Sequence, residues 1–222
     1  MNHSVSNTAR LLGTGLRALL VLTLVTGVVY PLVITGVAQG LLPGRANGSE
    51  IEADGKVVGS SLIGQSYTLP PKEGQKTPEP DLKWFQGRPA NGLGTNSVNT
   101  RYELILSGAT NRSADNAELI QWVKDAKAAV VEDNSVGGRT VRPSDVPADA
   151  VTSSGSGLDP HISPQYADLQ VHRVAERNGL PVAQVDRLVE EHTRGRTLGF
   201  LGEPRVNVLE LNIALKELRA ES

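Results

Sequence analysis

The sequence predicts an α+β protein: one N-terminal transmembrane helix, then a mixed soluble domain with short strands early and a helical C-terminal third. A run of 27 residues between Arg17 and Arg45 carries no charge. β-Branched residues follow an Asp-Gly pair soon after this run, and the last third of the chain repeats apolar residues at helical spacing. Strands gathered early and helices gathered late are typical of the α+β class.

The composition narrows the classes of function. The 222 residues are 39% hydrophobic and 21% charged with a net charge of −2, which is ordinary for a globular protein. Aromatic residues make up only 4%, and no basic excess accompanies them, so nucleic acid is not an expected partner. The absence of cysteine excludes disulfides, cysteine-ligated metals and thiol nucleophiles.

The uncharged run is long enough to cross a bilayer, which needs roughly 20 apolar residues in a helix. We expect a short N-terminal segment at 1–17, a transmembrane helix at 18–42 and a soluble domain at 45–222. A cleaved signal peptide is the alternative, but its apolar region spans only about 7–15 residues. Pro31 should kink the helix, because proline has no amide hydrogen to donate.

Small and polar residues within the span offer a candidate packing surface. Thr26, Gly27, Pro31 and Gly36 would allow a neighbouring helix to approach closely. The other interpretation is that such residues are simply common in membrane spans.

Charge counting does not orient the span. Arg10 and Arg17 lie before it, and Arg45 and Lys56 lie after it. The free amino terminus favours a cytoplasmic N-terminus, and long domains cross the membrane largely regardless of their charge. We therefore expect the soluble domain to be extracytoplasmic.

The first part of the soluble domain reads as strand and loop. Asp54-Gly55 predicts a turn, and the following "KVVGSSLIG" predicts one or two short strands. From Pro70 to about Arg101 the chain is dominated by Pro, Gly, Asn and Lys around "KWFQGRP". This segment is either a functional ordered loop or a mobile loop tethered by Trp84 and Phe85.

Helix signals dominate the remainder. The expected helix starts are Ser113, Ser163-Pro164, Pro181, and Asn207 with Glu210 three residues on, and a stop is expected at Gly179. Between the first two helices, prolines in "VRPSDVPADAVTSSGSG" should permit only short extended pieces.

The stretch "SGSGLDPHISPQ" carries the most enzyme-like residues: Ser154, Ser156, Asp159 and His161. A Ser-His-Asp triad requires these groups to converge beside an oxyanion hole, and residues two to five apart in one loop seldom do so. A metal site is not expected either, because His172 and His192 belong to separate helices. Phosphate-binding loops, H-E-x-x-H, G-x-S-x-G and the phosphorylation motif of P-type pumps are missing from the sequence. We therefore interpret the loop as a shaped segment that caps the helix beginning at Ser163-Pro164. Its candidate role is contact with a partner or a ligand.

Several motifs together resemble the KdpC family, the small single-span subunit of the bacterial Kdp potassium-transporting P-type ATPase. They are "YPLVITGVAQ", "GSSLIGQ", "WFQGRP", "SGSGLDPHISP", "VHRVAERNGL" and "LVEEHTRGRTLGFLGEPRVNVLELNIALKEL", and they cover nearly the whole chain. The segment "GRPANGLGTNSVN" departs from the family pattern, in which the proline is followed by Ser and a "SGGSNLG"-like run.

The resemblance implies an accessory subunit in the cell (inner) membrane that is not an enzyme alone. Its implied partners are a channel-like potassium-binding subunit, a P-type subunit that hydrolyses ATP, and the lipid bilayer. The family has also been described as a catalytic chaperone that raises ATP affinity through direct nucleotide contact. That role conflicts with an extracytoplasmic domain, so no cofactor is assigned to this chain, and ATP enters only through the resemblance. A membrane-anchored hydrolase using Ser156 and His161, and an anchored solute-binding module, are the alternatives from other classes.

Overall fold

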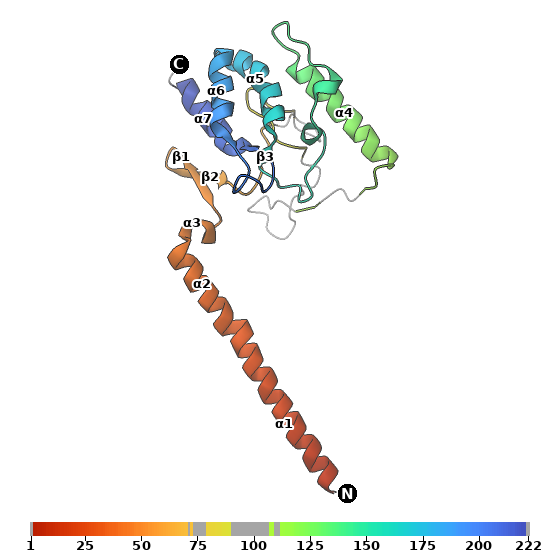
Figure 1. Ribbon diagram of the computed structural model, residues 1–222, viewed down its shortest axis with the longest axis vertical. Coiled ribbons are helices and arrows are strands. Elements are labelled where there is room, and N and C mark those ends of the chain that lie inside the picture. The colour runs from red at the N-terminus through yellow and green to blue at the C-terminus, as the bar shows by residue number, and fades with distance from the viewer. Residues whose placement is uncertain (1, 71, 73–78, 90–106, 109–111, 221–222) are drawn as a thin grey trace. The chain divides into compact units, whose positions relative to one another are not determined.

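The computed structural model describes residues 2–70, 72, 79–89, 107–108 and 112–220, with side chains described from Val5 onward. The chain divides into two compact units, Met1–Glu50 and Ile51–Ser222. Helix at one end, short strands and a helical C-terminal part confirm the predicted α+β class (Figure 1).

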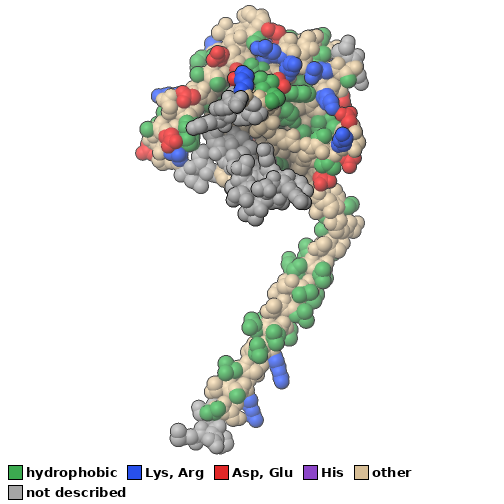
Figure 2. Space-filling model, turned by 180° about the vertical axis from the view of Figure 1, so that it is seen from behind, with side chains coloured by type: hydrophobic (Ala, Val, Ile, Leu, Met, Phe, Trp, Pro, Cys, Tyr) green, Lys and Arg blue, Asp and Glu red, His purple; other side chains and the backbone are tan. Residues whose placement is uncertain are grey.

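The N-terminal unit is one continuous run of helix. It comprises α1 (Asn2–Leu24), a π-helical turn (Val25–Val29) and α2 (Tyr30–Leu41), and the short α3 (Pro43–Ala46) follows. Residues Val5–Leu41 are long and apolar enough to cross a membrane, and Figure 2 shows apolar side chains along this helix. The helix thus begins well before residue 18 and ends at Leu41, and the part of it that crosses the membrane stays a prediction.

The π-helical turn lies directly before Pro31. The Tyr30 N–H donates to the carbonyl of Val25, five residues back. A wider turn is one way in which a helix accommodates a proline, which cannot donate to the preceding turn. The structure thus shows a changed hydrogen-bond pattern before Pro31, and the predicted kink in the helix stays a prediction.

Two small sheets occur in the described residues from Glu50 onward. Strands β1 (Glu50–Ala53) and β2 (Lys56–Ser60) form a hairpin, with Asp54 and Gly55 both at positive φ, as a two-residue type I′ turn requires. The second sheet has the order β3-β5-β4, from β3 (His161–Ile162), β5 (Arg205–Asn207) and β4 (Thr193–Arg194). Both pairings are antiparallel, with Ile162 and Thr193 on either side of Val206.

Four longer helices follow in the described residues after 112. They are α4 (Ala117–Asn134), α5 (Pro164–Asn178), α6 (Val182–His192) and α7 (Val208–Ala220). Three of them, α5, α6 and α7, contact β5. The cap at Ser163, the stop at left-handed Gly179 and the Asn207 cap of α7 confirm the sequence signals. The predicted start of α4 at Ser113 was wrong. The Asn116 side chain accepts from Leu119 N, and the helix begins after Asn116. The expected extended pieces are also wrong in part, since Pro143–Asp145 and Ala148–Ala150 form 3₁₀ turns.

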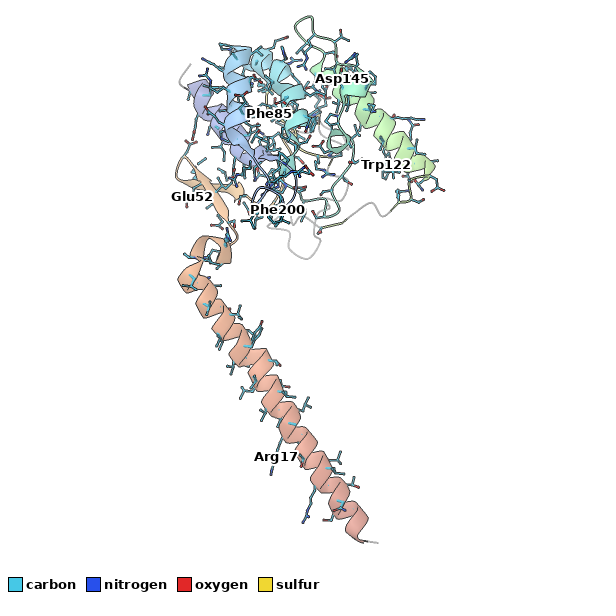
Figure 3. All side chains as sticks on the ribbon, in the orientation of Figure 1. Arg17, Glu52, Phe85, Trp122, Asp145 and Phe200 are labelled. Atoms are coloured by element: carbon cyan, nitrogen blue, oxygen red, sulfur yellow. The ribbon has the colours of Figure 1, made fainter. Side chains whose placement is uncertain are left out.

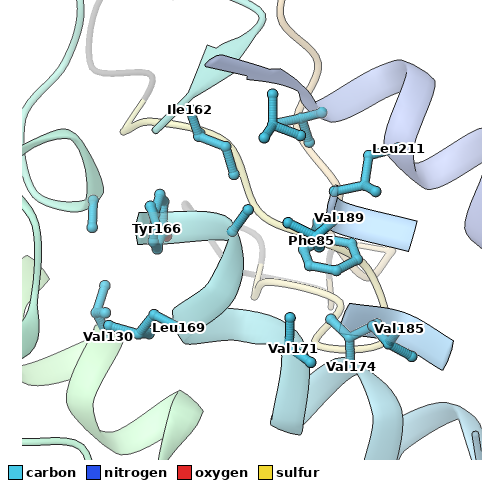
Figure 4. Packing of buried hydrophobic residues seen from close by; sticks show 14 of the residues in the cluster. Phe85, Val130, Ile162, Tyr166, Leu169, Val171, Val174, Val185, Val189 and Leu211 are labelled. Carbon is cyan, nitrogen blue, oxygen red and sulfur yellow. The ribbon is translucent and has the colours of Figure 1, made fainter. Parts of the chain in front are cut away.

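Helix α5 is the centre of the core. It packs against α4 on one side and α6 on the other, and most of its residues are buried. The Phe85 ring, fully buried, lies among side chains of α5, α6 and α7 (Figure 4). The described residues 79–89 of the proline-rich segment are therefore anchored in the core at Phe85. Residues 71, 73–78 and 90–101 lie outside the described residues, so the choice between the two interpretations of the segment stays open.

Candidate functional site

The predicted loop "SGSGLDPHIS" uses its polar side chains to hold its own backbone. The Ser156 hydroxyl accepts from Leu158 N at 3.1 Å, and the Ser154 hydroxyl accepts from Asp159 N at 3.4 Å. The two serine oxygens lie 3.3 Å apart. Among the residues that the structure describes, neither hydroxyl is hydrogen-bonded to the His161 ring, so the nucleophile–base pair of a triad is not formed here.

Asp159 is the electrostatic centre of the loop. Its Oδ1 accepts from the His161 backbone N–H at 3.0 Å and lies 3.1 Å from His161 Nδ1. Its Oδ2 lies 3.6 Å from Nη1 of Arg88. An ionised carboxylate only accepts, so the His161 proton is held on Nδ1. The His161 side chain, then its backbone N–H and the Arg88 charge, hold the pKa of Asp159 below its usual value against the opposing effect of partial burial.

Arg88 connects the "WFQGRP" segment to this loop. Its guanidinium donates to the carbonyls of Thr152 and Ser153, at 3.3 and 3.1 Å, in addition to its contact with Asp159. The Arg88 side chain thus contacts three polar groups of this loop region. The sequence predicted no role for Arg88, although this residue belongs to the "WFQGRP" motif. Its contacts join segments 64 to 71 residues apart, a relation that local spacing does not reveal.

A glycine lets a second motif approach the loop. Gly64, from "GSSLIGQ", donates its N–H to the Leu158 carbonyl at 2.7 Å. A Cβ at this position would lie 2.8 Å from the carbonyl oxygen of Asp159, closer than real contacts allow. Any larger residue at position 64 would therefore displace the loop, and three of the sequence motifs meet at this point.

The three motifs border a cavity of about 270 Å³. Its apolar part comes from Val130, Ala150, Tyr166 and Val208, and its polar part includes Gln65, Gln86, Arg88 and Asp159. The volume lies just below the range for ligand pockets, which is about 300–1,000 Å³. Burial raises the pKa of the Tyr166 hydroxyl to about 12, so it stays protonated at neutral pH.

Buried polar side chains hold the backbone of the same segment. Gln170 accepts from Gln86 N at 2.7 Å and donates to the Gln86 carbonyl at 3.1 Å. Asn212 does the same for Phe85, accepting at 2.9 Å and donating at 3.0 Å. Each amide therefore replaces the two hydrogen bonds that a neighbouring strand would supply.

Arg173 completes this network. It donates to Asn134 Oδ1 at 2.9 Å, to Gln170 Oε1 at 2.6 Å and to the carbonyls of Leu82 and Trp84. Burial lowers its pKa to about 10, so it remains charged at neutral pH. The sequence analysis missed these residues; the available signal was a polar residue at an apolar position of each predicted helix.

The other predicted residues lie in the N-terminal helix. The Thr26 hydroxyl donates to the Leu22 carbonyl at 2.7 Å, so its hydrogen is used within the helix. A Cβ at Gly27 or Gly36 would meet nothing within 4 Å. Their role in helix packing stays a prediction. No group of three or more metal-ligating His, Asp or Glu side chains occurs in the described ranges.

The lowered pKa of Asp159 gives a prediction with a definite sign. A carboxylate whose folded pKa is depressed adds stability that is present above its unfolded pKa of about 3.9 and is lost as pH falls through the folded pKa. We expect Asp159→Asn to lower the free energy of unfolding at pH 7, and the difference from the parent chain to shrink below about pH 4. Urea unfolding of the detergent-solubilised chain at pH 7, 5 and 3 measures this.

Asp168→Asn is the matched control with the opposite sign. Burial, with Asp186 and Glu190 nearby, raises the pKa of Asp168, so its charge opposes folding at neutral pH. This variant should be more stable than the parent at pH 7. A deficit in Asp159→Asn that is independent of pH would contradict the assigned electrostatics.

The sequence is similar to known proteins over nearly its whole length. The family model "KdpC: K+-transporting ATPase, c chain" matches residues 12–217. The chain is 80% identical to proteins named potassium-transporting ATPase KdpC subunit from Streptomyces coelicolor, over 99% of this chain and 98% of the relative, and from Streptomyces avermitilis, over the whole of both. A protein of the same name from Gemmatimonas aurantiaca is 47% identical over 93% of this chain and 94% of its own. The chain therefore belongs to the KdpC family of potassium-transporting ATPase subunits.

Proposed function

We propose that this chain is a non-catalytic accessory subunit of a high-affinity, ATP-driven potassium uptake complex. Its role is to assemble and stabilise a channel-like potassium-binding subunit and a P-type subunit that hydrolyses ATP. Family membership and the names of its relatives support a subunit of a potassium-transporting ATPase. The single apolar helix fits a single-pass membrane protein.

The observation that carries the non-catalytic role is the way in which the enzyme-like loop uses its side chains. Ser154 and Ser156 accept from the backbone of the same loop, and Asp159 accepts from His161. These bonds define a rigid surface between the cavity and the start of α5. A shaped surface of this kind suits contact with another subunit, which is the role we assign to Ser154, Ser156, Asp159 and His161.

Direct nucleotide contact is the alternative role, and the cavity beside Arg88 does not favour it. Arg88 is the one cation among the described residues that line the cavity, and its donors already engage two carbonyls and Asp159. The Asp159 carboxylate would repel a phosphate. The residues present thus do not fit a triphosphate, and no step is assigned to ATP on this chain.

The placement in the membrane follows from the sequence argument. We propose that the N-terminus is cytoplasmic, that residues 18–42 cross the cell (inner) membrane and that the domain at 45–222 is extracytoplasmic. Thr26, Gly27, Pro31 and Gly36 would then lie at membrane depth, where small side chains allow close helix contacts with the polytopic partners.

The assembly role predicts that the chain alone has no ATPase activity and co-purifies with both partner subunits. Ser156→Ala should cost about 1 kcal/mol of stability by freeing Leu158 N, yet leave ATP-driven potassium uptake in place. A His161→Ala complex that still assembles should retain uptake as well. ATP hydrolysis by the isolated chain, or loss of uptake in a Ser156→Ala complex that still assembles, would favour the membrane-anchored hydrolase instead.

The proposed orientation can be measured with single cysteines, because the chain has none of its own. Gln184 is exposed on α6, and Asn7 is exposed in α1 before the proposed span. A membrane-impermeant thiol reagent should label Gln184→Cys in intact cells and Asn7→Cys only after the cells are opened. The reverse pattern would place the domain in the cytoplasm, where it could meet ATP.

A further inference from the structure

An exposed apolar hairpin tip projects between β4 and β5. Leu198, Phe200 and Leu201 are 79%, 69% and 50% exposed. Figure 3 shows Phe200 at the periphery of the domain, in contrast to Phe85 in its interior. Three large apolar side chains within four residues are thus exposed. Grouped exposed apolar residues mark interaction sites more often than scattered ones do. We call residues Thr197–Leu201 the apolar tip.

The apolar tip has a fixed shape. Thr197 and Leu201 are bonded in both directions, each N–H donating to the other residue's carbonyl at 2.9 Å. The Gly199 N–H donates to the Arg196 carbonyl at 3.1 Å. A preformed loop loses little conformational entropy on binding, so more of its contact energy appears as affinity.

Leu198 holds a strained conformation within this loop. Its φ is +54°, in the left-handed region that bulky residues rarely adopt. Strain of this kind costs on the order of 1–3 kcal/mol and is concentrated at functional sites. In this strained conformation the apolar Leu198 side chain lies in solvent. In the chain alone it buries no apolar surface that would offset the strain.

Charges around the apolar tip are paired. Arg194 lies 2.6 Å from Glu210, and Arg196 lies 2.7 Å from Glu203. With Arg205 included, these five residues carry a net charge of only +1. Recognition of anionic lipid by charge relies on clusters of about 4–8 basic residues, which this region does not provide.

We propose that the apolar tip docks into an uncharged apolar pocket on a membrane-embedded partner subunit of the same complex, with Phe200 as the central anchor. Buried aromatic side chains carry most of the binding energy in many interfaces, and a ring of paired charges around them suits an interface rim. The proposal rests on the assembly role above and adds the surface through which it acts. A rigid, nearly neutral wedge fits a preformed protein pocket better than a fluid lipid surface.

Co-purification of the complex tests the anchor directly. Truncating a central aromatic anchor commonly costs about 2 kcal/mol or more, which is about thirtyfold in affinity, so Phe200→Ser should reduce recovery of the partner subunits about thirtyfold or more. Ile120→Ser is the matched control: Ile120 is 39% exposed on α4, outside the tip, and its replacement should leave recovery unchanged. Equal thermal unfolding of both variants and the parent shows that folding is intact.

Thiol labelling of Leu198→Cys identifies the occupant. In the full-length chain alone in lipid nanodiscs the thiol should react rapidly, and in the assembled complex it should react about tenfold or more slowly. Protection in nanodiscs without partners would assign the tip to the bilayer and overturn the proposal, as would equal labelling in the complex. Normal co-purification of Phe200→Ser would refute the docking surface alone, whereas failure of the parent chain to co-purify would refute the assembly role.

Discussion

The buried charge of Arg173 is the constraint on which the rest of the domain depends. Its side chain is only 1% exposed, and its hydrogen-bond partners among the described residues are neutral oxygens. A buried charge costs several kcal/mol unless its donors are satisfied. Two of those acceptors are the Leu82 and Trp84 carbonyls, so the fold can bury Arg173 only with the "LKWFQ" segment in place. The charge thereby requires a segment without regular secondary structure to adopt one conformation.

This constraint extends to the candidate site. Gln170 and Asn212 pair the backbone of Gln86 and Phe85, and Phe85 fills the core, so Arg88 emerges at a fixed point three residues later. There it bonds the Thr152 and Ser153 carbonyls and meets Asp159. Loss of either amide would leave buried backbone groups unpaired, at about 1–3 kcal/mol for each group. The buried network therefore fixes the conformation of the loop at 154–163 through Arg88.

Local signals in the sequence predicted local structure well. Ser163, Gly179 and Asn207 marked helix ends because their side chain or backbone conformation acts within a few residues. The Asp54-Gly55 turn succeeded for the same reason. Arg88, Gln170, Arg173 and Asn212 could not be found this way, since their partners lie many residues away in the chain. The three-stranded sheet was missed because its strands are two or three residues long, too short for an alternating pattern. Family resemblance pointed to a subunit of a potassium-transporting ATPase. The geometry adds that, among the described residues, the Ser154 and Ser156 hydroxyls bond the backbone of their own loop and not the His161 ring.

Amide hydrogen exchange at Phe85 and Gln86 tests the central role of the buried network most directly. If Arg173, Gln170 and Asn212 hold this segment as part of the core, both amides should exchange as slowly as those in the middle of α5. Gln170→Ala should then speed exchange at Gln86 and also at Leu158 and Asp159 in the loop, while the middle of α4 is unaffected. Fast exchange at Phe85 and Gln86 in the parent chain, at the rate of exposed loop amides, would contradict a segment fixed by the core.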